Sequence, residues 1–163
     1  MPNWCEGYLK IRGKREDLIN FIENEILLIN YTNEDNIKRQ NIKLEFDKFE
    51  YSFEYEKSEK RYLHLKGSER CFIEDESILF PYDERENVTH YLTLNIKRAW
   101  NVVNEKMLIE DSKKYHLDFN VYATERNLEF EEYITIIDGE ITKNETKEYD
   151  DFRFEAINPE LGG

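Results

Sequence analysis

The chain contains few residues of the kinds that build reactive sites. Its two cysteines, Cys5 and Cys71, do not form a CxxC pair, so we expect reduced thiols rather than a disulfide scaffold. The six glycines do not form a phosphate-cradling loop, which argues against a nucleotide-binding enzyme. There is no GxSxG motif, so nucleophilic catalysis has no support.

Long apolar runs are also missing. No segment approaches the roughly 18 apolar residues that a membrane-spanning helix needs. The N-terminus lacks the basic-then-apolar pattern of a signal peptide. We therefore expect the protein to stay in the cytoplasm of the host cell that makes it.

Metal-ligand patterns are scarce. The three histidines are widely separated: His64, His90 and His116. None has a second ligand at the spacing of a zinc site, and we expect no cofactor. Acidic metal sites are harder to exclude because the chain has 36 carboxylates. Asp138, Glu140, Asp150 and Asp151 are candidate ligands, so a metal-dependent phosphodiesterase or nuclease stays open as an alternative.

Negative charge dominates what is present. The 163 residues carry a formal net charge of -13 at pH 7, which disfavours nucleic acid and anionic membranes. A basic protein is the better electrostatic match. Aromatic residues make up 14% of the chain, and their rings bury enough area for one compact domain.

The first half of the chain begins with a clear alternation. Residues 4–12 alternate up to Gly13 and predict a strand, and residues 15–28 place apolar side chains at helical spacing. The polar, asparagine-rich residues 30–41 indicate a loop. Further strands are predicted at 42–46, 49–55, 61–66, 71–73 and 78–80, with a turn or bulge near Asp47-Lys48.

The second half begins with a strand over 89–98, a helix over 102–114 and a strand over 117–124. Asp138-Gly139 is a good type I′ turn pair between strands 130–137 and 140–146. Phe152 and Phe154 predict one more short strand, and residues 158–163 predict a flexible tail.

The order of these elements, β-α early and β-α-β late, fits a split β-α-β, or ferredoxin-like, sandwich. We therefore expect an α+β fold with a single domain over residues 1–157. The ferredoxin-like core would use residues 1–30 and 89–157, and residues 31–88 would form a β-rich insertion.

Several stretches carry a family resemblance. They are Met1-Pro2-Asn3-Trp4 with the strand up to Gly13, Leu18 to Phe21, Ala99-Trp100, Ser112 to Tyr115, Leu117 to Phe119, Glu125 to Phe130 and Asp138-Gly139. In these stretches the chain resembles the YubB-type ferredoxin-like proteins of phages and plasmids. The resemblance covers residues 1–28 and roughly 89–142 and implies a ferredoxin-like fold and a mobile-element origin. It brings no catalytic motif. After Ala99-Trp100 the chain lacks the proline-rich sequence that family members often have.

The predicted strand over 49–55 gives the sharpest indication of a partner. Its aromatic residues would face the core and its acidic residues water, with alternate residues about 6.6–6.8 Å apart, a spacing of similar order to that of DNA phosphates. The acidic surface would comprise Glu45, Asp47, Glu50, Glu54, Glu56, Glu74, Asp75 and Glu76. An ordinary solvated sheet face is the plainer interpretation. We predict a non-enzymatic phage or mobile-element protein, anti-CRISPR-like, that inhibits a host defence protein by occupying its basic nucleic-acid groove.

A single-stranded nucleic-acid-binding module is the other alternative. Some ferredoxin-like folds stack bases on sheet aromatics, and Tyr91, Tyr122 and Tyr133 are predicted strand residues. The nearest approach to a basic groove is the set Lys97, Arg98, Lys113 and Lys114. We expect these tyrosines to pack against a helix instead, with no direct contact to nucleic acid.

Overall fold

The computed structural model describes residues 3–33, 36–68, 70–85, 87–99 and 104–162. In chain order the elements are β1 (Trp4–Gly13), α1 (Arg15–Glu25), β2 (Ile26–Asn33), β3 (Asn36–Asn41), β4 (Glu45–Phe46), β5 (Glu50–Glu54), β6 (Arg61–Leu65), β7 (Cys71–Ile73), β8 (Ser77–Pro81), β9 (His90–Ala99), α2 (Glu105–Tyr115), β10 (Asp118–Glu125), β11 (Phe130–Ile137), β12 (Glu140–Glu148) and α3 (Phe152–Glu155). More of the described residues lie in strands than in helices, and the fold is α+β as predicted.

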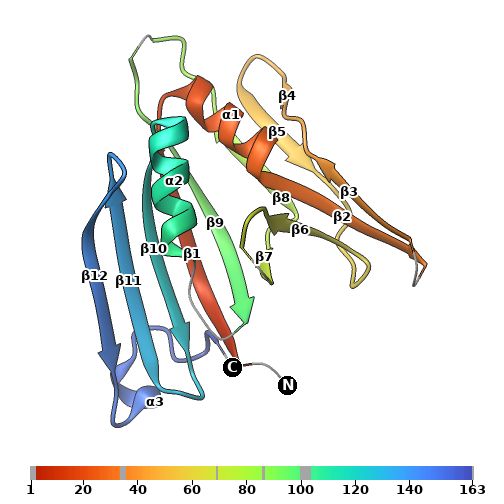
Figure 1. The fold of residues 1–163 in the computed structure, drawn as a ribbon. Coiled ribbons are helices and arrows are strands. Elements are labelled where there is room, and N and C mark those ends of the chain that lie inside the picture. Colours follow the sequence, from red (N-terminus) through yellow and green to blue (C-terminus); the bar gives the residue numbers. More distant parts are fainter. Residues whose placement is uncertain (1–2, 34–35, 69, 86, 100–103, 163) are drawn as a thin grey trace.

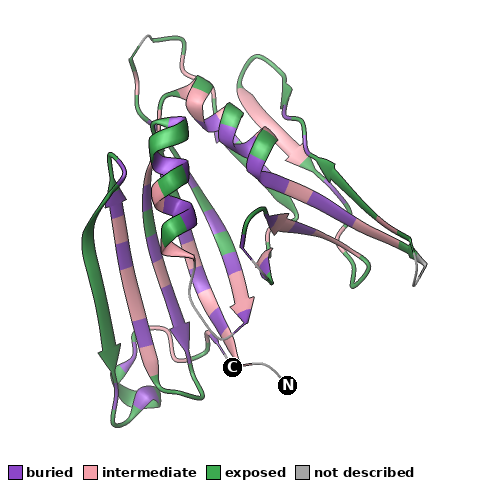
Figure 2. Cartoon of the chain, in the orientation of Figure 1, coloured by how far each residue is buried: buried purple, intermediate pink, exposed green. Residues whose placement is uncertain are grey.

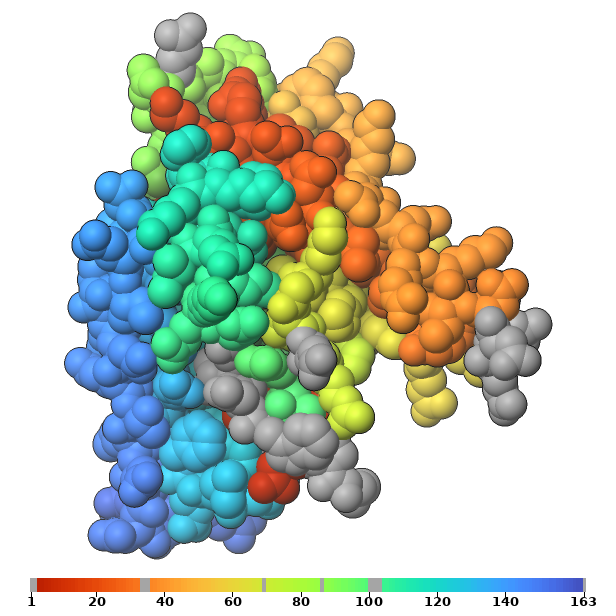
Figure 3. Space-filling view, viewed as in Figure 1, coloured from red at the N-terminus to blue at the C-terminus, as the bar shows by residue number. Residues whose placement is uncertain are grey.

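Two antiparallel sheets account for all strands of the described residues. Nine strands form a large sheet in the order β12-β11-β10-β1-β9-β7-β6-β2-β3, and β4-β5-β8 form a small one. Helices α1 and α2 contact each other, and they lie together on one side of the large sheet (Figure 1). Seen from this side in the space-filling view, they cover the middle of the face (Figure 3).

The core lies between the two helices and the large sheet. In β1, buried Cys5, Leu9 and Ile11 alternate with more exposed neighbours (Figure 2). Phe21 of α1 touches the rings of Tyr115 and Phe119, so that α1, α2 and β10 meet at one point. Fully burying a side chain of this size contributes about 1.5–3 kcal/mol.

The segment after α1 differs from the prediction. The helix ends at Glu25 instead of continuing to residue 28, and β2 begins at once. Residues 30–41, expected as a loop, are mostly strand, because β2 and β3 form a hairpin and β2 also pairs with β6. Where the chain leaves the helix, the Glu25 carbonyl accepts a hydrogen bond from the Lys66 amide (2.8 Å).

Two further predictions on aromatic residues need correction. Phe49 was expected in the core but is 78% exposed, because it precedes β5, in a turn where Lys48 has φ +86°. Phe152 and Phe154 belong to the short helix α3, so Phe152 is buried while Phe154 points away from the core. The predicted turn near Asp47-Lys48 is confirmed.

Segments outside the helix-covered core also have defined positions. Residues 31–88, predicted as an insertion, contain β3 to β8 and the end of β2. Residues 158–163 were expected to form a flexible tail, and within the described part of this segment the Gly162 amide donates to the Glu6 carboxylate (3.2 Å). Trp100 lies outside the described residues. Within them, no helix combines the length and apolar character needed to span a bilayer.

Candidate binding face

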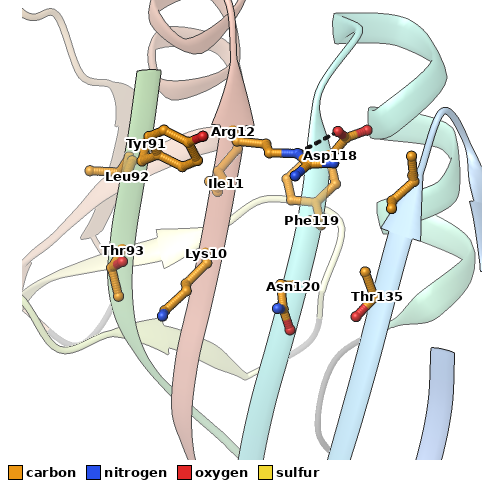
Figure 4. A pocket seen from close by; sticks show the side chains of 11 residues that line it. Lys10, Ile11, Arg12, Tyr91, Leu92, Thr93, Asp118, Phe119, Asn120 and Thr135 are labelled. Carbon is orange, nitrogen blue, oxygen red and sulfur yellow. Dashed lines mark hydrogen bonds and ion pairs between the residues drawn. The ribbon is translucent and has the colours of Figure 1, made fainter. Parts of the chain in front are cut away.

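The side of β11, β10, β1 and β9 that faces away from α1 and α2 is called the open face here. Strand alternation places on it the residues between the buried positions: Tyr8, Lys10 and Arg12 of β1, Tyr91 and Thr93 of β9, Asp118, Asn120 and Tyr122 of β10, and Tyr133 and Thr135 of β11. Figure 4 views part of this face, with the helices behind the strands.

Two hollows on the open face form one groove. The first, of about 290 Å³, lies across the four strands and is lined by Lys10, Arg12, Tyr91 and Asn120, among others (Figure 4). The second, of about 260 Å³, is lined by Tyr8, Lys10, Asn120, Tyr122 and Tyr133. Because Lys10 and Asn120 line both hollows, the two lie side by side. The open-face residues named above are called the tyrosine groove.

Three tyrosine rings form a platform at one end of the groove. The rings of Tyr8 and Tyr122 are stacked, with centroids 6.2 Å apart and planes 15° apart. Tyr122 and Tyr133 have centroids 5.0 Å apart. The ammonium of Lys143 lies 5.0 Å from the centre of the Tyr133 ring. This platform offers a flat ligand an aromatic surface with a cation beside it.

The carboxylate of Glu131 fixes the positions of the tyrosine hydroxyl groups of the platform. Glu131 is only 1% exposed and accepts hydrogen bonds from the hydroxyls of Tyr122 (2.8 Å), Tyr133 (3.1 Å) and Tyr149 (2.6 Å). Burial and then the Glu131 carboxylate raise the pKa of Tyr133 and Tyr149 to about 12, and they raise the pKa of Tyr122 as well. The three phenols therefore stay protonated near neutral pH and keep donating to Glu131.

Lys10 is the free cation of the groove. Arg12 pairs with Asp118 at 2.7 Å, whereas Lys10 makes no ion pair with any described residue and is exposed. The amide of Asn120 and the hydroxyls of Thr93 and Thr135 add neutral donors and acceptors around it. The groove therefore suits a ligand that combines a ring with a negative charge.

The interpretation that the three predicted tyrosines pack against a helix is wrong. Tyr91 is 67% exposed, and Tyr122 and Tyr133 face away from both helices because they alternate with buried Val121 and Ile134. Of the cations predicted beside them, Lys97 is on the same side of the large sheet, 5.1 Å from the Trp4 ring. Lys113 and Lys114 lie on α2, and Arg98 follows Lys97 on the other side of β9.

Sequence reasoning missed Tyr8, Lys10 and Asn120. The signal was present in β1, where Tyr8, Lys10 and Arg12 alternate with Leu9 and Ile11. It could not be recognised because the sequence does not show which face of β1 the helices cover. The pairing of β1 with β10 then brings Asn120 opposite Lys10.

The predicted acidic surface is divided between several environments. Three of its members, Glu45, Glu50 and Glu54, share the outer side of the small sheet, with Glu45 opposite Ser52. Three other members bind neighbouring groups of the chain itself. Asp47 accepts hydrogen bonds from the Phe49 and Glu50 amides, Glu74 pairs with Lys57 (2.8 Å), and Asp75 accepts hydrogen bonds from Asn95. Glu56 is exposed, and the Glu76 carbonyl accepts from Tyr55. The set therefore does not form one continuous track.

The candidate metal ligands do not converge. No group of three or more histidine, cysteine, aspartate or glutamate residues within the described chain could hold a metal ion. Asp138 lies in the β11–β12 turn, where φ is +51° at Asp138 and +73° at Gly139. Asp150 and Asp151 precede α3 and are exposed.

A buried acidic cluster lies between the helices. Glu25 of α1 accepts from the Tyr115 hydroxyl and pairs with Lys114 at 3.1 Å. Asp111 of α2 is 7% exposed, and its Oδ2 has no hydrogen-bond partner. Burial and then the neighbouring Glu25 raise the pKa of Asp111 to about 7. This cluster is on the side of the sheet opposite the tyrosine groove.

No family model matches the chain, and neither the curated proteins nor the solved structures contain a match. The resemblance to the YubB-type family therefore stays a prediction.

Proposed function

We propose that the protein binds a single-stranded nucleic acid in the tyrosine groove and catalyses no reaction on it. The observation that carries this proposal is the platform of Tyr8, Tyr122 and Tyr133 beside the unpaired Lys10. A base stacked on an aromatic side chain contributes about 1–3 kcal/mol without reading sequence. Lys10 is placed to meet the phosphate of such a base, and Asn120 to meet a polar edge.

The acidity of the chain does not oppose this proposal locally. Among the described residues that line the two hollows, Asp118 is the only carboxylate, and Arg12 neutralises it. Lys10 therefore remains as an unpaired positive charge of the groove in a chain of net charge -13, whereas the nearby Lys143 pairs with Glu145 at 3.4 Å. Because few phosphates would be neutralised, we expect a shallow dependence of affinity on salt.

The test is fluorescence anisotropy of a labelled single-stranded oligonucleotide at low salt. Lys10→Glu and Tyr8→Ala should each weaken binding about tenfold, because each removes one phosphate contact or one stacked base. Lys106→Glu on α2 makes the same charge change on an exposed residue of the helix-covered side and should leave affinity unchanged. Equal affinity of the wild type and Lys10→Glu would overturn the proposal.

The strand order supports a ferredoxin-like core. The units β1-α1-β2 and β9-α2-β10 place β10, β1 and β9 side by side, with α1 and α2 on one face. In this interpretation β6 and β7 are inserted between β9 and β2. A cytoplasmic protein of a phage or another mobile element, as the resemblance implies, is consistent with this core.

A second candidate function is inhibition of a basic host defence protein, as an anti-CRISPR would do. It is favoured by the outer side of the small sheet, where Glu45, Glu50 and Glu54 lie near exposed Leu79 (47%). Apolar contacts inside an acidic rim are typical of protein interfaces. In a pull-down from bacterial lysate, Glu50→Lys with Glu54→Lys should release a captured basic protein, while Lys10→Glu should not.

A further inference from the structure

A third hollow, of about 550 Å³, lies over β2, β6 and β7, away from the tyrosine groove. Cross-strand pairs place its residues on the same side of the large sheet: Lys97 is opposite Phe72, Phe72 is opposite His64, and His64 is opposite Leu27. Because directly opposed residues of neighbouring strands share a face, the hollow and the groove belong to one surface.

Aromatic rings form the walls of this hollow. The Phe72 ring lies 5.8 Å from the Trp4 ring and 5.2 Å from the Tyr62 ring, edge-on to the latter. Tyr62 also packs against Tyr31, with centroids 6.1 Å apart, and the two hydroxyls are hydrogen-bonded at 3.3 Å. The rings are therefore fixed by each other, and their remaining faces line a space large enough for a base.

The charge of the hollow is the opposite of the charge of the chain. Arg39, Lys66 and Arg70 line it, and no aspartate or glutamate is among the described residues that line it. Arg39 is exposed and makes no ion pair with a described residue. The exposed Arg39, with the cationic side chains of Lys66 and Arg70 along the same hollow, favours an anionic ligand with a ring, as a nucleotide is, in a protein of net charge -13.

The two sites are far enough apart to need a polymer. Phe72 lies at the level of Glu6 on β1, because both are opposite Lys97. His64 is opposite Phe72, so Tyr62, two residues before His64 on β6, lies at the level of Tyr8. Two residues along β1 and three strands across the sheet then separate Lys10 from Tyr62, about 16 Å at ~3.3 Å per residue and ~4.8 Å per strand. Lys97, above the Trp4 ring, lies on β9 between the strands of the two sites and pairs with Glu6 at 2.7 Å.

We propose that the hollow over β2, β6 and β7 is a second nucleotide-binding subsite, and that one single strand spans it and the tyrosine groove. This inference rests on the proposed function, since the strand must first bind in the groove. It identifies the ligand as a strand of several nucleotides rather than a mononucleotide, and it assigns a role to the strands that separate β9 from β2.

The test compares oligothymidylates of about 4 and about 12 nucleotides, within the range of site sizes of single-strand-binding folds. The wild type should bind the longer strand at least tenfold more tightly, beyond the statistical gain from more binding registers. Arg39→Glu should remove most of that gain while leaving the affinity for the short strand unchanged. Lys66→Glu should act in the same direction, and its stability in urea is measured in parallel because Lys66 also lies near the Asp111–Glu25 cluster. Lys38→Glu, the same charge change on the opposite face of β3, is the matched control.

The outcomes separate this inference from the proposed function. If the short strand binds and depends on Lys10, but Arg39→Glu and Lys66→Glu bind the long strand like the wild type, the second subsite is refuted and the groove stands. If Lys38→Glu weakens the long strand as much as Arg39→Glu, a general charge effect replaces the subsite. If neither strand binds, both proposals are refuted.

Discussion

Asp111 makes the stability of the fold depend on pH in a direction unusual for a carboxylate. It lies between α1 and α2, facing Glu25 of α1, Glu110 and Lys114 of its own helix, and Lys66 after β6. Replacing it by asparagine keeps its shape and removes its charge. Because the Oδ2 atom of Asp111 has no hydrogen-bond partner, few contacts are lost with the charge.

The direction of this pH dependence follows from the raised pKa of Asp111. The folded protein holds the Asp111 proton with a pKa of about 7, against an ordinary value of 3.8. The folded state therefore binds the proton more tightly than the unfolded state, and stability falls as the pH rises from about 4 to about 7. Above pH 7 the loss is complete. Solvent screening of this partly accessible pair limits the loss to about 1–2 kcal/mol.

The assay is urea unfolding followed by circular dichroism at pH 4.5 and pH 8. We expect Asp111→Asn to match the wild type at pH 4.5 and to exceed it by about 1–2 kcal/mol at pH 8. The difference between the two proteins cancels the contributions of other titrating groups. Glu56→Gln, at an exposed residue outside the helix pair, serves as the charge-matched reference. A variant that is less stable than the wild type at pH 8 would refute the reasoning.

Three further predictions concern other buried positions. Glu131→Gln should lower the free energy of unfolding by about 1–3 kcal/mol and weaken oligonucleotide binding in the anisotropy assay, whereas Tyr149→Phe, whose ring is outside the groove, should leave binding nearly intact. Gly7→Ala should destabilise the protein by about 1–3 kcal/mol or more in urea, because its Cβ would lie 1.9 Å from the Tyr122 carbonyl oxygen. Burial raises the pKa of Cys5 to about 12 and of Cys71 to about 11, so a thiol reagent at pH 8 should label them only as fast as the protein unfolds.

Local patterns were sufficient for the first strand and for the β11–β12 hairpin. The alternation up to Gly13 predicted β1, and Asp138-Gly139 predicted the β11–β12 hairpin, because both signals are local in the chain. The hairpin of β2 and β3 escaped prediction, since its residues are polar and β3 is an exposed edge strand. Its strand conformation depends on pairing with β6, far away in sequence.

The candidate site depended more heavily on distant pairings. Tyr122 and Tyr133 were recognised as strand residues from sequence alone, but their alternation is compatible with either face of the sheet. Only the packing of α1 and α2 on the other face left them exposed. The sequence does not distinguish Glu131 from the other acidic residues, of which the chain has 36 in all. Only the fold brings three tyrosine hydroxyls to it.

The sequence by itself determined the order of the main strands and helices and the overall charge, because backbone propensity, hydrophobic period and composition are properties of the chain. The tertiary structure decided which parts of the protein surface lack this negative charge. Side-chain alternation assigns residues to one of two faces without saying which face is covered, so the grouping of Lys10 with Asn120, and of Arg39 with Tyr62, came only from long-range strand pairing.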